Sequence, residues 1–579
     1  MRRTARLLAG LAVAFTTVVL SGSAASAHSV LLGTDPPIGG VIAGGPSELR
    51  LHFSGPVEVR FSAVQLTEPD GRQLPIGAAQ RAGGGRDLVA ALPSLRAGSY
   101  TVGWEVLSSD GHPATGQFGF SVGAPSGASP RLAARPARSP NLGFVAGQVR
   151  FAWFAAFMFL VGAAALRRLV WGPAVRASGP AASRADDRFR GWFAKALPAA
   201  WAVLAASGGA ALLFEAATVS GGSLSSALRP AVLSRLLGTS YGHLWMAQTA
   251  LTLALALPVL ALSRRGPAGP DPRRWRLAGA LLAGSIAAVA VANGHAGSAP
   301  HPLLPVVVLA GHLLAASVWA GGLAALVLLG LPAWRTPAPA DDAGPGQSLA
   351  REVLFRFSRL ALFSTAALIV TGVLGSRGNL GVLANLWRVA YGRMLLAKLV
   401  LLAVALVLAA RHLLVLPRRL AVPEPPGRGP RGRALASFGR TSRAEAVVLA
   451  AAVAVAAALV SAVPGRFAQV AAAHPVDMRQ AIGGHNVELV VAPTGPGPNQ
   501  LLLSFVGGDG VLVEGLDRAT ATLRQPDGST LPLDLTALSS GAFSASVSLP
   551  TAGPYRVAVS DPAGNSTTFS FKVPKPLPG

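Results

Sequence analysis

The stretch LLPVVVLAGHLLAASVWAGGLAALVLLGL, residues 303–331, decides the architecture of this chain. It contains no Asp, Glu, Lys or Arg, and about 20 consecutive apolar residues are enough for a helix to cross the hydrocarbon core of a bilayer. Its ionisable group is His312, which lies about two and a half turns into the expected helix at about 3.6 residues per turn. The stretch therefore predicts a membrane-spanning helix that carries a histidine.

Seven other apolar segments of similar length follow the same pattern. Half of the chain is hydrophobic (51%) and only 13% is charged. The eight expected spans are residues 144–166, 196–217, 243–262, 277–294, 303–331, 359–376, 392–411 and 444–463. This composition predicts an eight-helix transmembrane bundle in the lipid bilayer of the cell (inner or plasma) membrane, and it argues against a large soluble enzyme.

The arginines give the bundle an orientation. The formal net charge is +25, and most of the arginines near the spans lie in alternate loops, at residues 167–190, 264–276, 335–356 and 411–440. Loops rich in Lys and Arg stay in the cytoplasm. We therefore expect the regions at both ends of the chain to be extracytoplasmic, and we interpret the positive charge as a topology signal and expect no nucleic-acid partner.

The N-terminus has the three parts of a secretory signal peptide. Arg2, Arg3 and Arg6 precede an apolar run at residues 7–20, and small residues end in Ala25-Ser26-Ala27. This order is typical of a leader that is cleaved after an A-x-A site. Removal of residues 1–27 would make His28 the first residue of the mature protein.

Segments with the alternation of β-strands lie on both sides of the bundle. Residues 28–123 alternate between apolar and polar side chains and predict an Ig-like or cupredoxin-like β-sandwich, followed by a linker at 124–141 and the membrane domain at 142–464. Residues 480–573 predict a second extracytoplasmic β-sandwich. LTEPDGRQLPI (66–76) is echoed by LRQPDGSTLPL (523–533), which indicates two sandwiches of similar type.

A terminal histidine offers two nitrogens to one metal ion. The α-amine and the imidazole of His28 have ordinary pKa values of about 7.7–8.0 and about 6.5, so both can be deprotonated near neutral pH. The amine and Nδ1 can close a six-membered chelate ring. The simpler interpretation is that His28 is only the first polar residue after a leader. The chain has no cysteine, so any metal site must use His, Asp, Glu, Met or backbone ligands.

The motif SSDGHP, residues 108–113, supplies a carboxylate and a second imidazole. Asp110 and His112 stand two positions apart, so in an extended segment they project from one face. Together with His28 they give three nitrogens and one oxygen, a donor set that suits tetragonal Cu(II). Alone, the motif is more often a turn aspartate and a surface histidine, and it becomes informative together with an N-terminal histidine and the absence of thiolates.

Four further histidines lie in or near the extracytoplasmic side of the bundle. His295 and His301 follow the fourth span, His312 lies within the fifth, and His243 begins the third. Ionisable groups at such depth are costly and usually face the bundle interior for function. We therefore treat all four as candidate metal ligands, with His295 and His301 equally interpretable as plain loop residues.

The sequence also resembles known families. HSVLLGTDPPIGGVIAGGPSELRLHFSGPVE together with SSDGHPATGQFGFSV resembles the CopC family of periplasmic copper-binding proteins, and this resemblance implies Cu(II) ligands at His28, Asp110 and His112. GHLLAASVWAGGLAAL, RFSRLALFSTAALIVTGVLGS and YGRMLLAKLVLLAVALVLAARH resemble CopD, a copper transport protein of the inner membrane. The C-terminal region resembles the YtkA-like sandwiches often attached to CopD proteins.

These resemblances imply a copper-binding and copper-transport protein that is not an enzyme. The exported domain would capture Cu(II) and pass it to the bundle, with Cu(I) as the form in the membrane, for copper import, homeostasis or resistance. An extracytoplasmic copper chaperone or a cuproenzyme is the expected protein partner. No nucleotide-binding motif is present. Two alternatives stay open: a haem-binding or redox membrane protein, and a copper-dependent oxidative enzyme.

Overall fold

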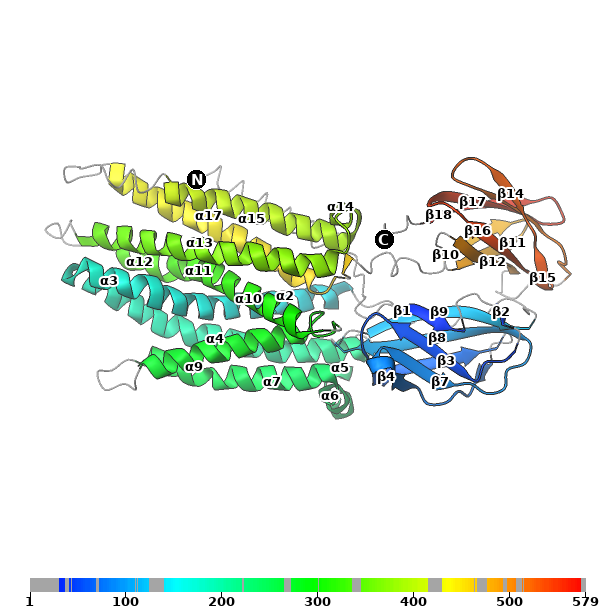
Figure 1. Cartoon of the computed structure of the whole chain (residues 1–579), viewed down its shortest axis with the longest axis horizontal. Helices are drawn as coiled ribbons and strands as arrows, with labels where there is room; N and C mark the ends of the chain where they lie inside the picture. Colours follow the sequence, from blue (N-terminus) through cyan, green and yellow to red (C-terminus); the bar gives the residue numbers. More distant parts are fainter. Residues whose placement is uncertain are drawn as a thin grey trace. The chain divides into compact units, whose positions relative to one another are not determined.

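The computed structural model describes residues 31–36, 41–42, 44–68, 72–109, 111, 113–123, 140–220, 223–264, 272–299, 301–335, 345–414, 430–462, 464–465, 476–492, 497–506, 513 and 515–573. Contacts divide the chain into two compact units. One unit holds the helices between residues 138 and 465, and the other holds the strands that precede and follow them (Figure 1).

The strands that precede the helices form two sheets. They are β1 (Leu31–Asp35), β2 (Val41–Ile42), β3 (Glu48–Phe53), β4 (Val57–Thr67), β5 (Gln73–Leu74), β6 (Gln80–Ala82), β7 (Asp87–Ala91), β8 (Gly98–Ser108) and β9 (Pro113–Val122), with a 3-10 turn η1 (Gly83–Gly85). The sheet orders are β1-β3-β7-β6 and β2-β9-β8-β4-β5. All pairs are antiparallel except the short β2–β9 pair.

The core of this domain lies between the two sheets. Leu49, Leu51 and Phe53 alternate with more exposed residues along β3 and are at most 1% exposed. Residues of β8 complete the core, and the ring of Phe53 meets the ring of Trp104 edge-on, with centroids 5.4 Å apart. The strand alternation in the sequence therefore reflects a β-sandwich, as predicted.

The strands that follow the helices form a second sandwich. They are β10 (Val476–Ile482), β11 (His485–Ala492), β12 (Gly497–Val506), β13 (Thr520–Arg524), β14 (Thr530–Leu533), β15 (Thr536–Ser539), β16 (Ala542–Leu549), β17 (Gly553–Ser560) and β18 (Ser566–Val573). The sheet orders are β10-β11-β12-β16-β15 and β14-β13-β17-β18. The buried residues between the sheets form a core of their own.

The two sandwiches share one strand order. The run β5-β4-β8-β9 of the first corresponds to β14-β13-β17-β18 of the second, and β1-β3-β7-β6 corresponds to β11-β12-β16-β15. The echoed sequences occupy matching positions: Leu66 pairs with Leu74 in the first hairpin, and Leu523 pairs with Leu531 in the second. The prediction of two sandwiches of similar type is confirmed.

Both sandwiches also contain the same tyrosine contact. The hydroxyl of Tyr100 donates to the carbonyl of Arg96 at 2.9 Å, and the hydroxyl of Tyr555 donates to the carbonyl of Thr551 at 2.7 Å. In each case the acceptor lies four residues upstream. A tyrosine that bonds back to the upstream backbone is a recurring device for fixing a corner of a sandwich.

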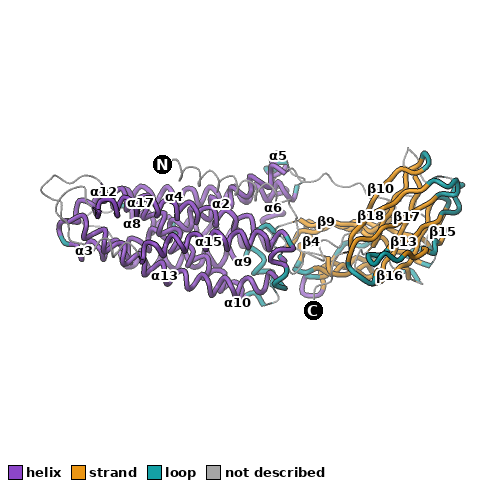
Figure 2. Tube along the Cα trace, turned by 90° about the horizontal axis from the view of Figure 1, so that it is seen from above, coloured by secondary structure: helices purple, strands orange, loops and turns teal. Residues whose placement is uncertain are grey.

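The helical unit contains eight helices that are long and apolar enough to cross a membrane by length and composition, among the described residues. They run side by side in both views (Figure 1, Figure 2). The helical elements are α2 (Pro140–Ala165), η2 (Leu166–Trp171), α3 (Gly172–Ser178), η3 (Pro180–Ala182), α4 (Ser183–Val219), α5 (Leu224–Ala227), α6 (Pro230–Leu237), α7 (Ser240–Ala254), α8 (Ala256–Ser263), α9 (Pro272–Ala292), α10 (Leu303–Ala316), η4 (Ser317–Gly321), α11 (Gly322–Ala325), η5 (Leu326–Gly330), α12 (Leu331–Arg335), α13 (Pro345–Leu380), α14 (Asn385–Arg388), α15 (Ala390–Leu414) and α17 (Pro430–Leu459).

A buried carboxylate joins the first two long helices. Asp186 of α4 is 2% exposed. Its Oδ1 accepts from Arg167 Nη1 at 2.8 Å and from Trp171 Nε1 at 3.1 Å, and its Oδ2 accepts from Arg190 Nε at 2.8 Å. Because Arg167 and Trp171 belong to the π-helical segment η2, the carboxylate ties this wider turn to the start of α4.

Glycines bring two helices into backbone contact. A Cβ added at Gly162 of α2 would overlap the backbone of Gly321, Gly322 and Ser317, and one added at Gly321 would overlap the carbonyl of Met158. Small residues allow such close approach where lipid supplies no hydrophobic drive for helix association. The Gly321-Gly322 pair in the apolar stretch of residues 303–331 therefore allows close helix packing.

Gly162→Ala is expected to destabilise the bundle by about 1–3 kcal/mol, because the new methyl group cannot be accommodated without moving the backbone of the facing helix. Gly147→Ala, on the same helix, is the matched control because a Cβ there meets nothing within 4 Å. Thermal unfolding of the purified protein in detergent measures both. Equal stability of the two variants would contradict the close contact.

Candidate metal-binding sites

His28, Asp110 and His112 lie outside the described residues, but the strand ends that carry them are described. β8 ends at Ser108 and β9 begins at Pro113, and the sequence positions of Asp110 and His112 fall between these two paired strands. Within this turn the amide of Gly111 donates to the carbonyl of Ser108 at 2.9 Å, and Gly111 has φ +91°. A positive φ is adopted readily by glycine, so Gly111 suits the turn.

The start of β1 lies at the end of the first sandwich that carries the β8–β9 turn. Leu31, three positions after His28, pairs with Phe53 at the end of β3. β4 begins directly afterwards, and its first residue pairs with Ser108, while the amide of Ser109 donates to the carbonyl of Pro56 at 2.9 Å. The start of β1 and the β8–β9 turn therefore lie at one end of the sandwich. Three extended residues reach about 10 Å.

A charged cluster lies on the neighbouring strands β3 and β7. His52 and Asp87 are directly paired residues, and His52 Nδ1 lies 2.5 Å from Asp87 Oδ1. Arg50 Nη1 donates to Asp87 Oδ2 at 3.2 Å. The hydrogen bond with His52, followed by that of Arg50, lowers the pKa of Asp87 despite the opposing effect of burial.

This lowered pKa predicts that the stability of the first sandwich depends on pH. A carboxyl group whose pKa is depressed on folding contributes stability above its unfolded value of about 3.9 and loses it as the pH falls through the folded value. Asp87→Asn is therefore expected to be less stable than the wild type at neutral pH, with the difference shrinking below about pH 3.9. Urea unfolding of residues 28–123 across this range measures it. A difference that does not change with pH would contradict the prediction.

In the bundle, His312 of α10 contacts α13. His312 Nδ1 lies 2.9 Å from Thr371 Oγ1, and a Cβ added at Gly372 would lie 3.3 Å from His312 Cε1. Lys398 of α15 lies within electrostatic range of the ring. Thr371 was not among the candidates because an uncharged threonine in an apolar span carries no signal of its own.

The other candidate histidines lie at helix ends and in the turns between helices. His243 is exposed in the first turn of α7, His295 is half-buried in the turn after α9, and His301 is exposed before α10. Within the described ranges, no three His, Asp or Glu side chains come together in a set that could hold a metal ion.

A polar cluster that the candidates did not include lies near the end of the bundle where α4 ends. Arg150 of α2 donates to Ser461 Oγ and, at 3.3 Å, to the carbonyl of Ala457. The buried side chains of Glu215 and Tyr241 lie within electrostatic range of this guanidinium. A charged residue inside the first apolar span was the signal that could have found this cluster.

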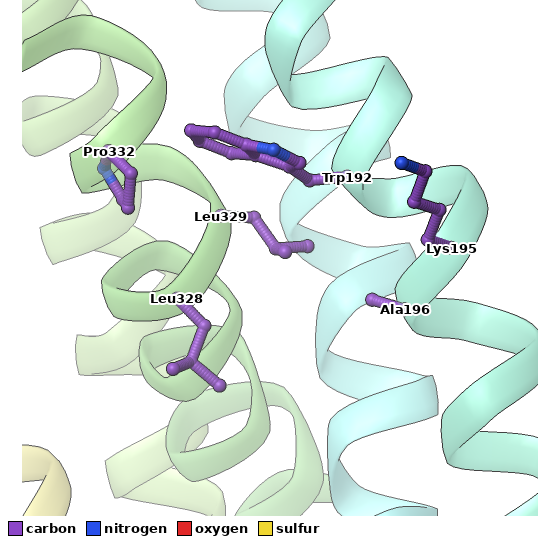
Figure 3. A pocket seen from close by; sticks show the side chains of 6 residues that line it. All are labelled: Trp192, Lys195, Ala196, Leu328, Leu329 and Pro332. Carbon is purple, nitrogen blue, oxygen red and sulfur yellow. The ribbon is translucent and has the colours of Figure 1, made fainter. Parts of the chain in front are cut away.

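A shallow groove of about 390 Å³ lies toward the other end of α4. Trp192, Lys195 and Ala196 of α4 face Leu328, Leu329 and Pro332 across it (Figure 3). These side chains include no His, Asp or Glu, so the groove has no metal ligands of the kind that the sequence predicted.

The fold therefore defines a multi-pass membrane protein with a β-sandwich before and after its helical bundle. Family models match three parts of the chain: the CopC domain at residues 31–123, the copper resistance protein D-like N-terminal domain at 142–301, and copper resistance protein D at 351–459. The chain belongs to the CopC/CopD family of copper resistance and transport proteins.

The chain is also similar to individual proteins. The copper transport protein CutJ of Bacillus subtilis (strain 168) is 26% identical over 505 residues, which cover 86% of this chain and 85% of that protein. Protein YobA of Escherichia coli (strain K12) is 34% identical over 124 residues, 21% of this chain and 99% of that protein. The crystal structure of CopC from Methylosinus trichosporium OB3b is 33% identical and covers 17% of this chain and 95% of its own, with a TM-score of 0.16.

Proposed function

We propose that this protein captures Cu(II) on its N-terminal sandwich and passes copper to the helical bundle, which moves it into the cell. His28 supplies its α-amine and Nδ1, Asp110 a carboxylate oxygen, and His112 an imidazole nitrogen. Three nitrogens and one oxygen suit Cu(II), which also stands at the top of the divalent affinity order.

The observation that supports this site is the convergence of strand ends in the first sandwich. The start of β1 and the β8–β9 turn lie at one end of the domain. Residue 28 precedes β1 by a few positions, and residues 110 and 112 belong to the turn. This convergence supports a site whose ligands come from distant parts of the sequence, with an amine that leader cleavage would supply.

The direction of transfer follows from the expected topology. The arginine-rich loops favour an extracytoplasmic position for both sandwiches, so capture takes place outside and transfer runs inward. Inside the bundle His312 is the ligand that lies deepest in its span, and His243, His295 and His301 are ligands for entry.

Copper accumulation in cells tests the proposal. Cells that express the wild type are expected to accumulate more copper than cells that express the double variant His28→Ala, His112→Ala, at equal protein levels in the membrane. His485→Ala, in the C-terminal sandwich, is the matched control and is expected to behave as the wild type. Lower copper in wild-type cells than in the double variant would contradict inward transport, and equal copper would contradict the capture site.

A further inference from the structure

The hydrogen bonds of Thr371 restrict the protonation of the His312 ring. Thr371 Oγ1 lies 2.6 Å from the carbonyl oxygen of Ala367, one turn earlier on α13. Because a carbonyl can only accept, the single hydroxyl proton of Thr371 must be donated there. At 2.9 Å from His312 Nδ1, the same oxygen can then only accept. The ring nitrogen that faces Thr371 must therefore carry hydrogen.

A neutral imidazole has one N–H and one lone pair. If Nδ1 carries the hydrogen, the lone pair is on Nε2. We infer that Thr371 is a positioning residue that holds His312 in the Nδ1–H tautomer and so presents Nε2 as a ligand to copper in transit. This inference rests on the proposed function and adds to it the ligand atom and the residue that orients it. A partner on the second ring nitrogen is the usual means of fixing a metal-binding histidine.

Gly372 allows this arrangement. The ring of His312 lies so close to α13 that a Cβ at position 372 would be 3.3 Å from Cε1 and 3.8 Å from Nδ1. A methyl group there would push the ring away by a few tenths of an ångström and lengthen the bond to Thr371. The Thr-Gly pair thus combines an acceptor for Nδ1–H with the space for the ring to reach it.

Two features of the surroundings bear on a ligand at Nε2. Among the described residues, the hydrogen-bond geometry gives Nδ1 its contact with Thr371 and gives Nε2 none, and the other polar contact of the ring is the backbone carbonyl of Leu368 on the same helix. The charged neighbour is Lys398, within electrostatic range of the ring. Its positive charge would oppose a cation bound at Nε2, so its removal is expected to strengthen binding there, an effect that damage to packing does not produce.

The test is ¹⁵N NMR of the full-length protein, labelled at histidine and reconstituted in lipid bilayers. Silver(I) serves as a diamagnetic probe in place of Cu(I). The His312 resonances are identified by their absence in His312→Gln. In the wild type, Nε2 is expected to give the resonance of a nitrogen without hydrogen, and silver is expected to shift Nε2 while Nδ1 keeps its hydrogen.

Thr371→Val keeps the shape of the side chain and removes the acceptor. It is expected to release a mixture of tautomers and to weaken silver binding at His312 by about 10–100-fold, the usual effect of losing an outer partner of a metal ligand. Thr371→Ser keeps the hydroxyl and is expected to restore both readouts. Lys398→Met is expected to bind silver at His312 more tightly than the wild type.

Three outcomes would overturn the inference: a wild-type His312 with hydrogen on Nε2, a Thr371→Val protein with unchanged tautomer and affinity, or a Lys398→Met protein with no gain. If any of these occurs while copper accumulation depends on His28 and His112, the role of Thr371 is wrong and the proposed function stands. If silver binds Nε2 as expected but accumulation does not depend on the sandwich ligands, the proposed function is wrong and the ligand assignment stands.

Discussion

One extra residue ahead of His28 is expected to lower the Cu(II) affinity of the N-terminal sandwich by more than about 100-fold. The extension converts the α-amine into an amide, which is not a basic donor at neutral pH, and the chelate ring is lost. Loss of a residue that hydrogen-bonds to a metal ligand already lowers metal affinity by about 10–100-fold. Loss of a direct donor together with its chelate ring should lower the affinity further. Each tenfold change corresponds to about 1.4 kcal/mol.

Competition titration against a chelator of known affinity measures the change, and electron paramagnetic resonance reports the number of nitrogens on Cu(II). Asp110→Asn and His112→Ala are expected to weaken binding as well, with the terminal chelate still in place. His52→Ala is the control, because that histidine is already engaged by Asp87. Equal affinity of the extended and native proteins would rule out the terminal chelate.

Asp186→Ala is expected to destabilise the bundle by about 3–5 kcal/mol, the usual effect of removing one partner from a buried ion pair. The substitution removes this buried acceptor from Arg167, whose side chain is 15% exposed, and from the indole of Trp171. Arg190 is half-exposed and can return to solvent, so most of the loss comes from Arg167.

The next residue in the sequence provides a matched control. Asp187 is exposed on the same turn of α4, and Asp187→Ala removes the same charge without leaving a buried group unpaired. Thermal unfolding in detergent at equal ionic strength compares the two variants. If they lose equal stability, the effect comes from the net charge of this loop and the buried carboxylate contributes nothing of its own.

Hydropathy predicted the number and order of the spans but not their full lengths. The first span was expected at 144–166, yet the helix continues through η2 and α3 to Ser178. Arg167 and Arg168 signal the edge of the apolar core, and no hydropathy pattern reveals that Arg167 is paired with a carboxylate nineteen residues later. Long-range pairing of this kind becomes visible only in three dimensions.

The sandwiches were predictable because strands repeat every second residue and turns use characteristic residues. Two short echoed stretches indicated that the domains are of one type, and the shared strand order confirms it. The extra strands were not predictable: β2 adds to the first sandwich and β10 to the second, at the edge of a sheet in each case. An edge strand contributes few residues to the core, so the alternation of apolar and polar residues in its sequence is weak.

The candidate ligands could be predicted from residue type, but the residues that surround them could not. His312 was a candidate because an ionisable group within an apolar span is costly. Thr371 and Gly372, the residues against which it packs, are common in helices of membrane proteins and carry no charge. Arg150 was missed although it lies within an apolar run. A search restricted to metal-ligating side chains passes over the residues that orient them.

The backbone contact at Gly162 and Gly321 limits how the bundle can move. Two helices whose main chains touch cannot slide along each other or turn about their axes, because any side chain brought to the crossing would collide. The helix of residues 140–178 and the helix of residues 303–335 therefore behave as one rigid pair. The helix that carries Thr371 lies outside this backbone contact, and its movement away from the pair would release His312.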